Sequence, residues 1–371
     1  MKIVAASDSF KGSLTSLEVA EYVELGVHDI FPCGEVIKLC VADGGEGTVD
    51  ALYSNLSGKT ISIQVSDPLG RKIQASYFMT TDGHTAVVEM SAASGLPLLD
   101  PSEYNPMKTS TYGTGELISD ALSRGCRRFL VGIGGSATND AGMGMLAALG
   151  YRFYDSQGQN LDASGSSLSL ISGVDVTHAH PALAEAEFIV ACDVDSPMYG
   201  PDGAAYIYAP QKGADEHMVR LLDNGLRHFS SIAVNETGKD ISELPGAGAA
   251  GGLGGCFVAF LNASLTSGAD LILDAIGFDD IIEGADLVVT GEGRMDSQTL
   301  RGKLPFKIMS RAASKGVPCA AVCGSCVLDK SAVGNSGFYV VHPVTPVGVS
   351  LEKAMQPSTA GGNIGPVAKY A

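Results

Sequence analysis

Six short segments of the sequence are rich in glycine, hydroxyl, carboxylate or basic side chains. They come where an apolar run ends or a helix is expected to begin, at residues 8–13, 42–48, 132–142, 192–195, 210–213 and 290–299. Phosphoryl transfer needs backbone N–H groups and hydroxyls to hold phosphate oxygens, and cations to offset their charge. It also needs carboxylates that hold Mg²⁺ or accept a hydroxyl proton. These residue types therefore predict phosphoryl transfer.

The familiar nucleotide-binding signatures are missing. The chain has no GxxxxGK[ST] segment and no HRD or DFG set, which argues against a P-loop protein or a protein kinase. One GxGxxG occurs at residues 246–251, but it follows Ser-Glu-Leu-Pro instead of an apolar strand. We interpret it as a chance match to a dinucleotide-binding turn, and keep a dinucleotide-binding oxidoreductase as an alternative.

The composition bounds the partners and the compartment. With 24 Lys and Arg against 41 Asp and Glu, the 371 residues carry a formal net charge of −17. Such a chain repels nucleic acid and anionic lipid, so neither is expected as a partner. No apolar run reaches the ~18 residues of a membrane span, and the first apolar run is too short for a secretory signal. Eight scattered cysteines are typical of free thiols, so we expect a cytoplasmic protein.

The order of the predicted elements indicates an α/β fold with two domains. A strand at 1–7, a helix capped by Thr15 or Ser16 and a strand near 35–42 begin an open α/β domain. Between residues 59 and 90 the apolar residues alternate with a period of two, which predicts antiparallel strands. From about residue 270 the α/β rhythm returns, with apolar runs typical of buried parallel strands. We expect 1–60 plus 266–371 to form one discontinuous domain, 61–265 to form an inserted mixed α/β domain, and the site to lie in the cleft between them.

Six motifs together resemble one known family. DSFKGSL, ADGGEGT, GIGGSATNDAGMGMLAALG, CDVDSP, APQKGAD and TGEGRMDSQTL occur in this order over most of the chain, and they are similar to motifs of the bacterial glycerate kinases of the type-1 family. The resemblance implies that ATP and Mg²⁺ are used to phosphorylate D-glycerate, with 2-phosphoglycerate as the product. It also implies that the open domain is flavodoxin-like. The closing stretch, 356–371, departs from the family by being richer in glycine.

Four residues are expected to act on the reacting groups. Lys11 would contact a phosphate or the glycerate carboxylate, and Arg294 would neutralise the transferring phosphoryl group. Asp193 follows an apolar strand and is the first candidate for the base that accepts the hydroxyl proton, with Asp296 as its rival. The structural alternatives are a solvated lysine at 11 and an ion pair between Arg294 and a neighbouring carboxylate.

Further residues are expected to hold Mg²⁺, ATP or glycerate. Asp43 and Glu46 would hold Mg²⁺ or substrate hydroxyls, although Glu46 also suits a helix N-terminus. The segment 134–140 is expected to cradle a phosphate or glycerate, its alternative being a tight turn that Asp140 caps. The residues expected to bind ATP or glycerate are Gly134, Gly135, Ser136, Thr138, Asn139, Asp140, Glu292, Lys212, Ser9 and Ser13.

An acidic chain that holds ATP and glycerate should gather its few cations at one cleft. We expect this of Lys11, Lys212, Arg294 and Lys303. The partners expected are ATP and D-glycerate, with neither nucleic acid nor membrane, and the protein is expected to be a monomer or a homodimer. Besides the oxidoreductase, the alternatives are a kinase for another small hydroxy acid and a ligand sensor that has lost catalysis.

Overall fold

A computed structural model describes residues 1–43, 48–346 and 348–368 of the chain. The backbone divides into two compact units, which we name unit 1 (Met1–Leu56 with Gly268–Ala371) and unit 2 (Ser57–Ser267). The domain boundaries expected after residues 60 and 265 stay a prediction.

The described part of unit 1 contains a five-stranded parallel sheet in the order β13-β12-β11-β1-β2. Its strands are β1 (Lys2–Ser7), β2 (Glu35–Cys40), β11 (Leu287–Met295), β12 (Cys319–Cys326) and β13 (Val340–Pro343). Counted along this unit alone, the order is 2-1-3-4-5, which is that of a flavodoxin-like sheet. The order reverses between β1 and β11, and a ligand is expected where the carboxyl ends of these two strands meet.

The first helix of unit 1 begins where the sequence predicts it. Thr15 Oγ1 accepts a hydrogen bond from the backbone N–H of Glu18 at 3.3 Å, and the Glu18 carboxylate accepts one from the backbone N–H of Thr15 at 2.8 Å. This reciprocal capping satisfies N–H groups that a helix start leaves without partners. Val19, Val23 and Val27 then fall on one face of α1 (Ser16–His28) and are buried.

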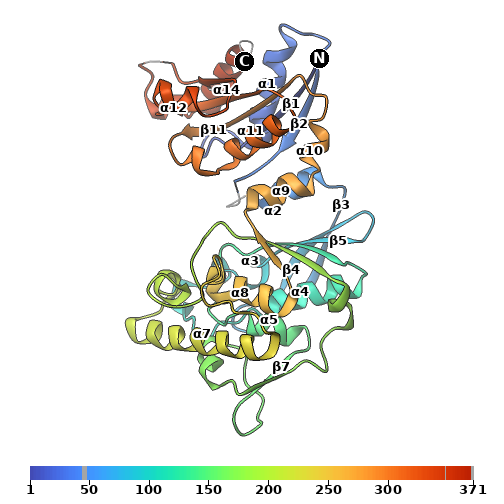
Figure 1. Ribbon diagram of the computed structural model, residues 1–371, viewed down its shortest axis with the longest axis vertical. Coiled ribbons are helices and arrows are strands. Elements are labelled where there is room, and N and C mark those ends of the chain that lie inside the picture. The colour runs from blue at the N-terminus through green and yellow to red at the C-terminus, as the bar shows by residue number, and fades with distance from the viewer. Residues whose placement is uncertain (44–47, 347, 369–371) are drawn as a thin grey trace. The chain divides into compact units, whose positions relative to one another are not determined.

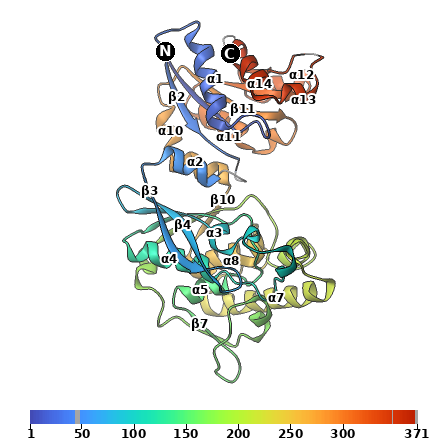
Figure 2. The ribbon, with the colours of Figure 1, turned by 180° about the vertical axis from the view of Figure 1, so that it is seen from behind.

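Helices cover both faces of the unit 1 sheet, as a parallel sheet requires. They are α1, α2 (Thr48–Asn55), α9 (Gly268–Ala275), α10 (Phe278–Ile281), α11 (Leu304–Ser314), α12 (Lys330–Gly334), α13 (Leu351–Ala354) and α14 (Pro357–Ala368). α1 and α14 lie side by side over one face, while α11 packs on the other against β1, β11 and β12 (Figures 1 and 2). A Cβ at Gly361 would stand 2.1 Å from the Tyr22 ring, so the glycine-rich α14 lets the two helices approach closely.

The described part of unit 2 contains a six-stranded mixed sheet in the order β10-β9-β6-β5-β4-β3. Its strands are β3 (Gly58–Ser66), β4 (Lys72–Thr80), β5 (Thr85–Glu89), β6 (Arg128–Gly132), β9 (Glu187–Ala191) and β10 (Ser264–Thr266), and a separate ribbon pairs β7 (Arg152–Tyr154) with β8 (Gly173–Asp175). β3, β4 and β5 pair antiparallel, which confirms the prediction from their alternating pattern, whereas β5, β6, β9 and β10 pair in parallel.

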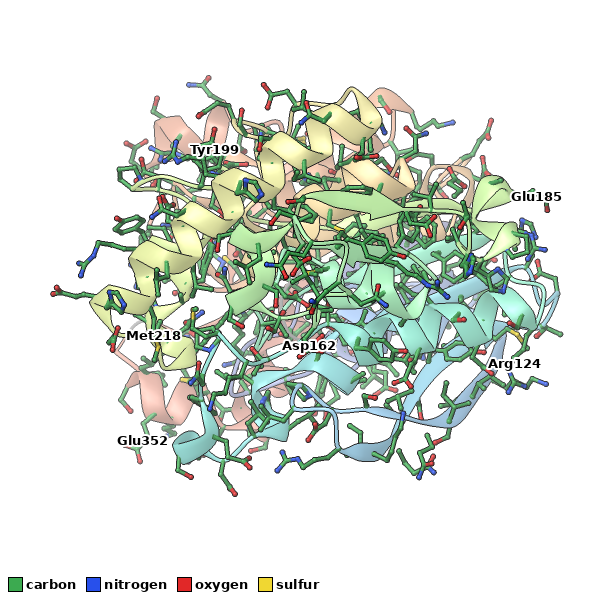
Figure 3. All side chains as sticks on the ribbon, turned by 90° about the horizontal axis from the view of Figure 1, so that it is seen from below. Arg124, Asp162, Glu185, Tyr199, Met218 and Glu352 are labelled. Carbon is green, nitrogen blue, oxygen red and sulfur yellow. The ribbon has the colours of Figure 1, made fainter. Side chains whose placement is uncertain are left out.

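One large hydrophobic core holds unit 2 together. Its helices are α3 (Ser91–Ser94), α4 (Tyr112–Ser123), α5 (Met143–Ala148), α6 (Ala204–Tyr208), α7 (Glu216–Thr237) and α8 (Ala249–Leu261). Residues of α4, α5, α7 and α8 pack with alternate residues of the strands, including Phe129 and Phe188, whose ring centroids stack 4.7 Å apart. Charged side chains such as Arg124 and Glu185 point outward from this unit (Figure 3). Among the described helices, none is long and apolar enough to cross a membrane.

Candidate active site

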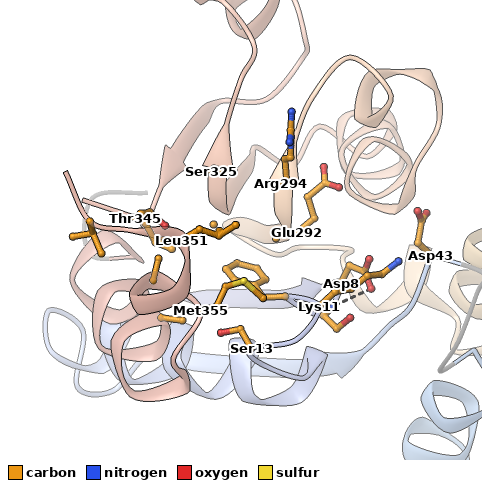
Figure 4. Close-up of a pocket in the computed structure, with 18 of the residues that line it drawn as sticks. Asp8, Lys11, Ser13, Asp43, Glu292, Arg294, Ser325, Thr345, Leu351 and Met355 are labelled. Carbon is orange, nitrogen blue, oxygen red and sulfur yellow. Dashed lines mark hydrogen bonds between the residues drawn. The ribbon is translucent and has the colours of Figure 1, made fainter. Parts of the chain in front are cut away.

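A cavity of about 590 Å³ lies in unit 1, at the carboxyl ends of β1 and β11. Its walls come from the turn after β1, from β11 and β12, from the start of α11 and from the segment 344–360 (Figure 4). The cavity therefore lies where the reversal of strand order predicts a ligand site, and its volume is in the usual range for a small-molecule pocket.

The turn after β1 brings a basic residue and two hydroxyls to this cavity. The backbone N–H of Asp8 donates to the carbonyl of Gly291 at 2.9 Å, which ties the turn to β11. The Asp8 carboxylate accepts the N–H of Ser9 at 2.8 Å. Ser9, the exposed Lys11 and Ser13 all line the cavity. Backbone pairing between neighbouring strands thus sets where these side chains lie.

Asp43 comes from the segment after β2 and also lines the cavity. Its carboxylate accepts the backbone N–H of Leu304 at 2.7 Å, one of the N–H groups at the start of α11. Burial raises the pKa of Asp43, while the Leu304 hydrogen bond and the nearby ammonium of Lys303 act in the opposite direction.

Two more carboxyl groups, those of Glu292 and Asp8, line the same cavity, and both have raised pKa values. Burial raises the pKa of Glu292, on β11, to about 7, although Thr299 Oγ1 donates to its carboxylate at 2.5 Å. Burial, with a contribution from the nearby Asp43, likewise raises the pKa of Asp8 to about 6. Carboxyl groups that crowd each other in this way favour a proton or a cation between them.

Two basic residues from the later segment of unit 1, Arg294 and Lys303, also line the cavity. Arg294, at the end of β11, is exposed, with its Nε 3.9 Å from Oδ2 of Asp296. Lys303 stands at the N-terminal cap of α11 and is half-buried. Asp296 itself forms a turn by accepting the N–H of Gln298 at 2.8 Å, and is outside the lining of the cavity. Together with Lys11, three cations and three carboxyl groups line one cavity.

The predicted phosphate cradle at 134–140 lies in unit 2 and is mostly closed. Gly134 and Gly135 are exposed, but the side chains from Ser136 to Asp140 are buried. The Asp140 carboxylate accepts Thr111 N and Thr111 Oγ1, both at 2.8 Å, Gly144 N at 3.1 Å and Gly142 N at 3.2 Å. It thus holds the starts of α4 and α5 together.

Lys212, from the segment 210–213, is a buried basic residue that contacts this loop. Its side chain is 2% exposed, and its Nζ donates to the carbonyl of Thr138 at 2.6 Å and to Ser136 Oγ at 3.3 Å. Burial lowers the pKa of Lys212 to about 7, against the raising effect of Asp140. The fully buried amide of Asn139 has no hydrogen-bond partner within the described residues. Most of the polar groups of this loop therefore bond to the protein itself.

The glycine cluster at 245–255 packs against this loop. Ala250, Gly251 and Gly252 adopt left-handed backbone angles inside α8, and the Gly251 carbonyl accepts the N–H of Ala141 at 3.0 Å. A Cβ at Gly251 would stand 2.2 Å from the carbonyl oxygen of Thr138, so only glycine fits. The cluster follows a turn and not a strand, so this GxGxxG lacks the setting of a dinucleotide-binding turn.

Comparisons with known proteins show which family the chain resembles. A model of the glycerate kinase family matches residues 3–366. The chain is 45% identical to a glycerate kinase of Bacillus subtilis (strain 168), over 96% of this chain and 93% of the relative. It is 42% identical to a glycerate 2-kinase of Escherichia coli (strain K12), with the same two coverages. A crystal structure described as a glycerate kinase 2 from Salmonella typhimurium LT2 superimposes with a TM-score of 0.87 at 39% identity, covering 100% of this chain and 96% of the other.

The chain belongs to the glycerate kinase family. Its fold is α/β, as predicted, and the family consists of enzymes.

Within this glycerate kinase fold, the predicted site residues fall into two groups. Ser9, Lys11, Ser13, Asp43, Glu292 and Arg294 line the unit 1 cavity. Asp296 lies just beyond Arg294 on the chain, and Glu46 is outside the described residues. The rest belong to unit 2, where Asp193 is exposed after β9: they are Gly134, Gly135, Ser136, Thr138, Asn139, Asp140, Asp193 and Lys212.

The sequence analysis missed Asp8 and the apolar wall of the cavity. Asp8 carries a recognisable signal, because it is an acidic residue directly after a buried parallel strand. The wall formed by Val344, Leu351 and Met355 carries no such signal, since these residues fall in short helices and loops without a clear period.

Two cysteines of β12 flank a part of the cavity wall. Cys323 and Cys326 lie in the strand itself, and Gly324 and Ser325 between them line the cavity. Burial raises the pKa of Cys323, so its thiol is poorly suited to redox chemistry. A Cβ at Gly324 would stand 2.3 Å from the carbonyl oxygen of Gly293, which makes the segment a packing element of the sheet.

Proposed function

We propose that this chain transfers the γ-phosphoryl group of ATP to the 2-hydroxyl of D-glycerate and forms 2-phosphoglycerate and ADP. Membership of the glycerate kinase family supports the reaction, and the relative in Escherichia coli carries the name glycerate 2-kinase. The observation that carries the proposal is the single cavity lined by Lys11, Arg294 and Lys303 together with three carboxyl groups.

In this proposal the cations act on the phosphates. The 2-hydroxyl oxygen forms the new bond to phosphorus, the bond from phosphorus to the bridging oxygen of ADP breaks, and the hydroxyl proton passes to a carboxylate. Lys11, Arg294 and Lys303 offset the negative charge of the phosphate oxygens during this exchange. Fixed cations in a partly buried cavity act more strongly there than in water.

Asp193 remains the first candidate for the proton acceptor, and Asp296 its rival. A carboxylate near its ordinary pKa suffices, because its main task is to orient the hydroxyl. Asp193 belongs to unit 2 and Asp296 to unit 1. The expectation that transfer takes place between the two domains stays a prediction.

Mg²⁺ fits the carboxylates of the cavity if ATP brings part of its coordination. Among the described residues, no three His, Cys, Asp or Glu side chains come together as a metal site. Mg²⁺ commonly takes only one or two protein carboxylates and fills its other positions with phosphates and water. Asp43 is the candidate ligand that the structure describes, and a bound Mg²⁺ would supply further neutralisation of the phosphate charge.

The direct test is to incubate the purified protein with ATP, Mg²⁺ and D-glycerate and to identify the product by ³¹P NMR. We expect a phosphate resonance coupled to the proton on carbon 2, together with one ADP for each phosphoglycerate. Absence of any phosphoglycerate would refute the proposal, whereas a 3-phosphate product would refute only the position. Other small hydroxy acids at equal concentration test whether D-glycerate is the preferred substrate.

A further inference from the structure

The unit 1 cavity has two chemically different ends. Asp8, Lys11 and Asp43 lie at one end, whereas Leu351 and Met355 lie at the other (Figure 4). Four further apolar residues line the cavity and are themselves buried: Phe10, Val344, Ala354 and Ala360. A ligand that fills the whole cavity must therefore have a charged part and an apolar part.

Neither glycerate nor phosphate accounts for the apolar end. Each carbon of D-glycerate carries oxygen, so it offers almost no apolar surface to such a wall. The side chain of Leu351 is 74% exposed although it lines the cavity, which leaves apolar surface for a ligand to cover. A flat heteroaromatic ring with polar edges suits a pocket of apolar side chains with a few polar groups.

We propose that the apolar end of this cavity binds the adenine ring of ATP, with the phosphates extending to the end that carries Lys11. The inference rests on the proposed function and assigns the nucleotide to unit 1. The charged end provides cations for the phosphates, so both parts of one molecule find matching surroundings in one cavity.

A polar atom near the apolar end points to the same ligand. Ser13 Oγ is buried and has no hydrogen-bond partner among the described residues, and Ser13 lines the cavity next to Met355 (Figure 4). A buried hydroxyl without a partner is costly, and such atoms in native proteins usually await a ligand or a water molecule. A ring nitrogen or a ribose hydroxyl would supply that partner.

The wall of the apolar end is anchored to the sheet. The backbone N–H of Val344 donates to the carbonyl of Cys323 at 2.8 Å, and that of Thr345 donates to the carbonyl of Gly324 at 3.2 Å. Gly12 has a φ of +75°, and a Cβ there would stand 3.0 Å from Cε of Met355. The turn after β1 therefore leaves just enough room for Met355, and the subsite is formed before a ligand arrives.

Titration calorimetry with two probes, ADP and inorganic pyrophosphate, each with Mg²⁺, tests the inference. Pyrophosphate reports on the charged end alone, and ADP reports on both ends. The variant is Leu351→Asn, which is neutral and replaces an exposed side chain. Its matched control is Leu25→Asn, since Leu25 is 61% exposed, belongs to unit 1 and lies outside the lining. Met355→Ala is a second variant that removes contact without adding polarity.

We expect Leu351→Asn to raise the Kd for ADP about tenfold and to leave the Kd for pyrophosphate unchanged, with Met355→Ala acting in the same sense and Leu25→Asn having no effect. An unchanged Kd for ADP in both cavity variants, or an equal loss for both probes, would overturn the inference while the kinase activity stands. Failure of the unmodified protein to bind ADP or to turn over ATP would overturn the proposed function and this subsite with it.

Discussion

The two units place the same kinds of residue in opposite settings. In unit 1, Lys11 follows a strand in a glycine turn and lines a cavity with carboxyl groups whose pKa values are raised. In unit 2, Lys212 also lies in a glycine turn, but it is buried and donates to the carbonyl of Thr138. We expect the first turn to offer its polar groups to a ligand, whereas Lys212 of the second bonds to the loop at 134–140.

This difference bears on the expectation that an acidic chain gathers its basic residues at one ligand site. Of the four cations expected at one cleft, Lys11, Arg294 and Lys303 line the unit 1 cavity, whereas Lys212 belongs to unit 2. Cations that line a cavity can neutralise a ligand, while a buried amino group already satisfied by protein oxygens mainly stabilises a loop. We therefore predict that the first group acts on the substrates and that Lys212 mainly stabilises its surroundings.

The largest expected effect comes from Lys11. Lys11→Met should lower kcat/KM for ATP by roughly 10²–10³-fold, because it removes a fixed cation from the phosphates. The side chain is exposed, so the free energy of unfolding should change by no more than about 0.5 kcal/mol. Steady-state kinetics and urea unfolding measure the two quantities.

Lys315→Met is the matched control, since Lys315 is exposed in the same unit and lies outside the cavity. It should leave both quantities unchanged. An equal loss of activity in the two variants, or a loss of stability in Lys11→Met, would break the distinction between the two lysines.

The second prediction tests which of the two units supplies the proton acceptor. Asparagine at position 193 or 296 keeps a hydrogen-bonding oxygen but cannot take a proton, so the variant at the true base should lose ~10²-fold in kcat. Asp193→Asn is expected to show this loss, with Asp296→Asn nearer the original rate. The reverse result would place the proton acceptor in unit 1, beside Arg294.

The sequence predicts the fold well because its patterns are local. The capping residues at Thr15 and the alternating strands after residue 58 depend on neighbours in the chain, and both predictions are confirmed. Part of the glycine excess of α14 and of residues 245–255 has long-range causes, since Gly361 makes room for Tyr22 and Gly251 for Thr138. No local pattern contains that information.

The candidate site could be predicted only in part, for a similar reason. Glycine turns after strands indicate ligand contact, and six of the residues chosen this way line one cavity. The same rule selects Asp140 and Lys212, whose groups bond to Thr111, Thr138 and nearby backbone. Whether a turn faces a ligand or the protein depends on what packs behind it, here the left-handed segment of α8.

The third prediction concerns the stability role of the unit 2 loop. Asp140→Ala leaves the hydroxyl of Thr111 and buried backbone N–H groups, including those of Thr111 and Gly144, without this acceptor. We expect the free energy of unfolding to fall by about 3 kcal/mol, as measured by urea unfolding. Asp140→Asn keeps one acceptor oxygen and should lose less. Full stability in Asp140→Ala with loss of ATP binding would instead make Asp140 a ligand contact.

The last prediction is a pH dependence that isolates Lys212, and its effect over a single pH unit is smaller than the effects above. Burial holds its pKa at about 7, below the ordinary 10.5, so between these values the unfolded chain binds a proton that the folded chain lacks. Stability contributed by this group therefore rises with pH through that window, by no more than about 1.4 kcal/mol per pH unit. Lys212→Met does not titrate, so the difference in unfolding free energy, unmodified protein minus variant, should increase from pH 7 toward pH 10. A difference that stays flat would mean that Lys212 remains charged in the folded chain, as a cation facing a ligand site would, and the contrast with Lys11 would then disappear.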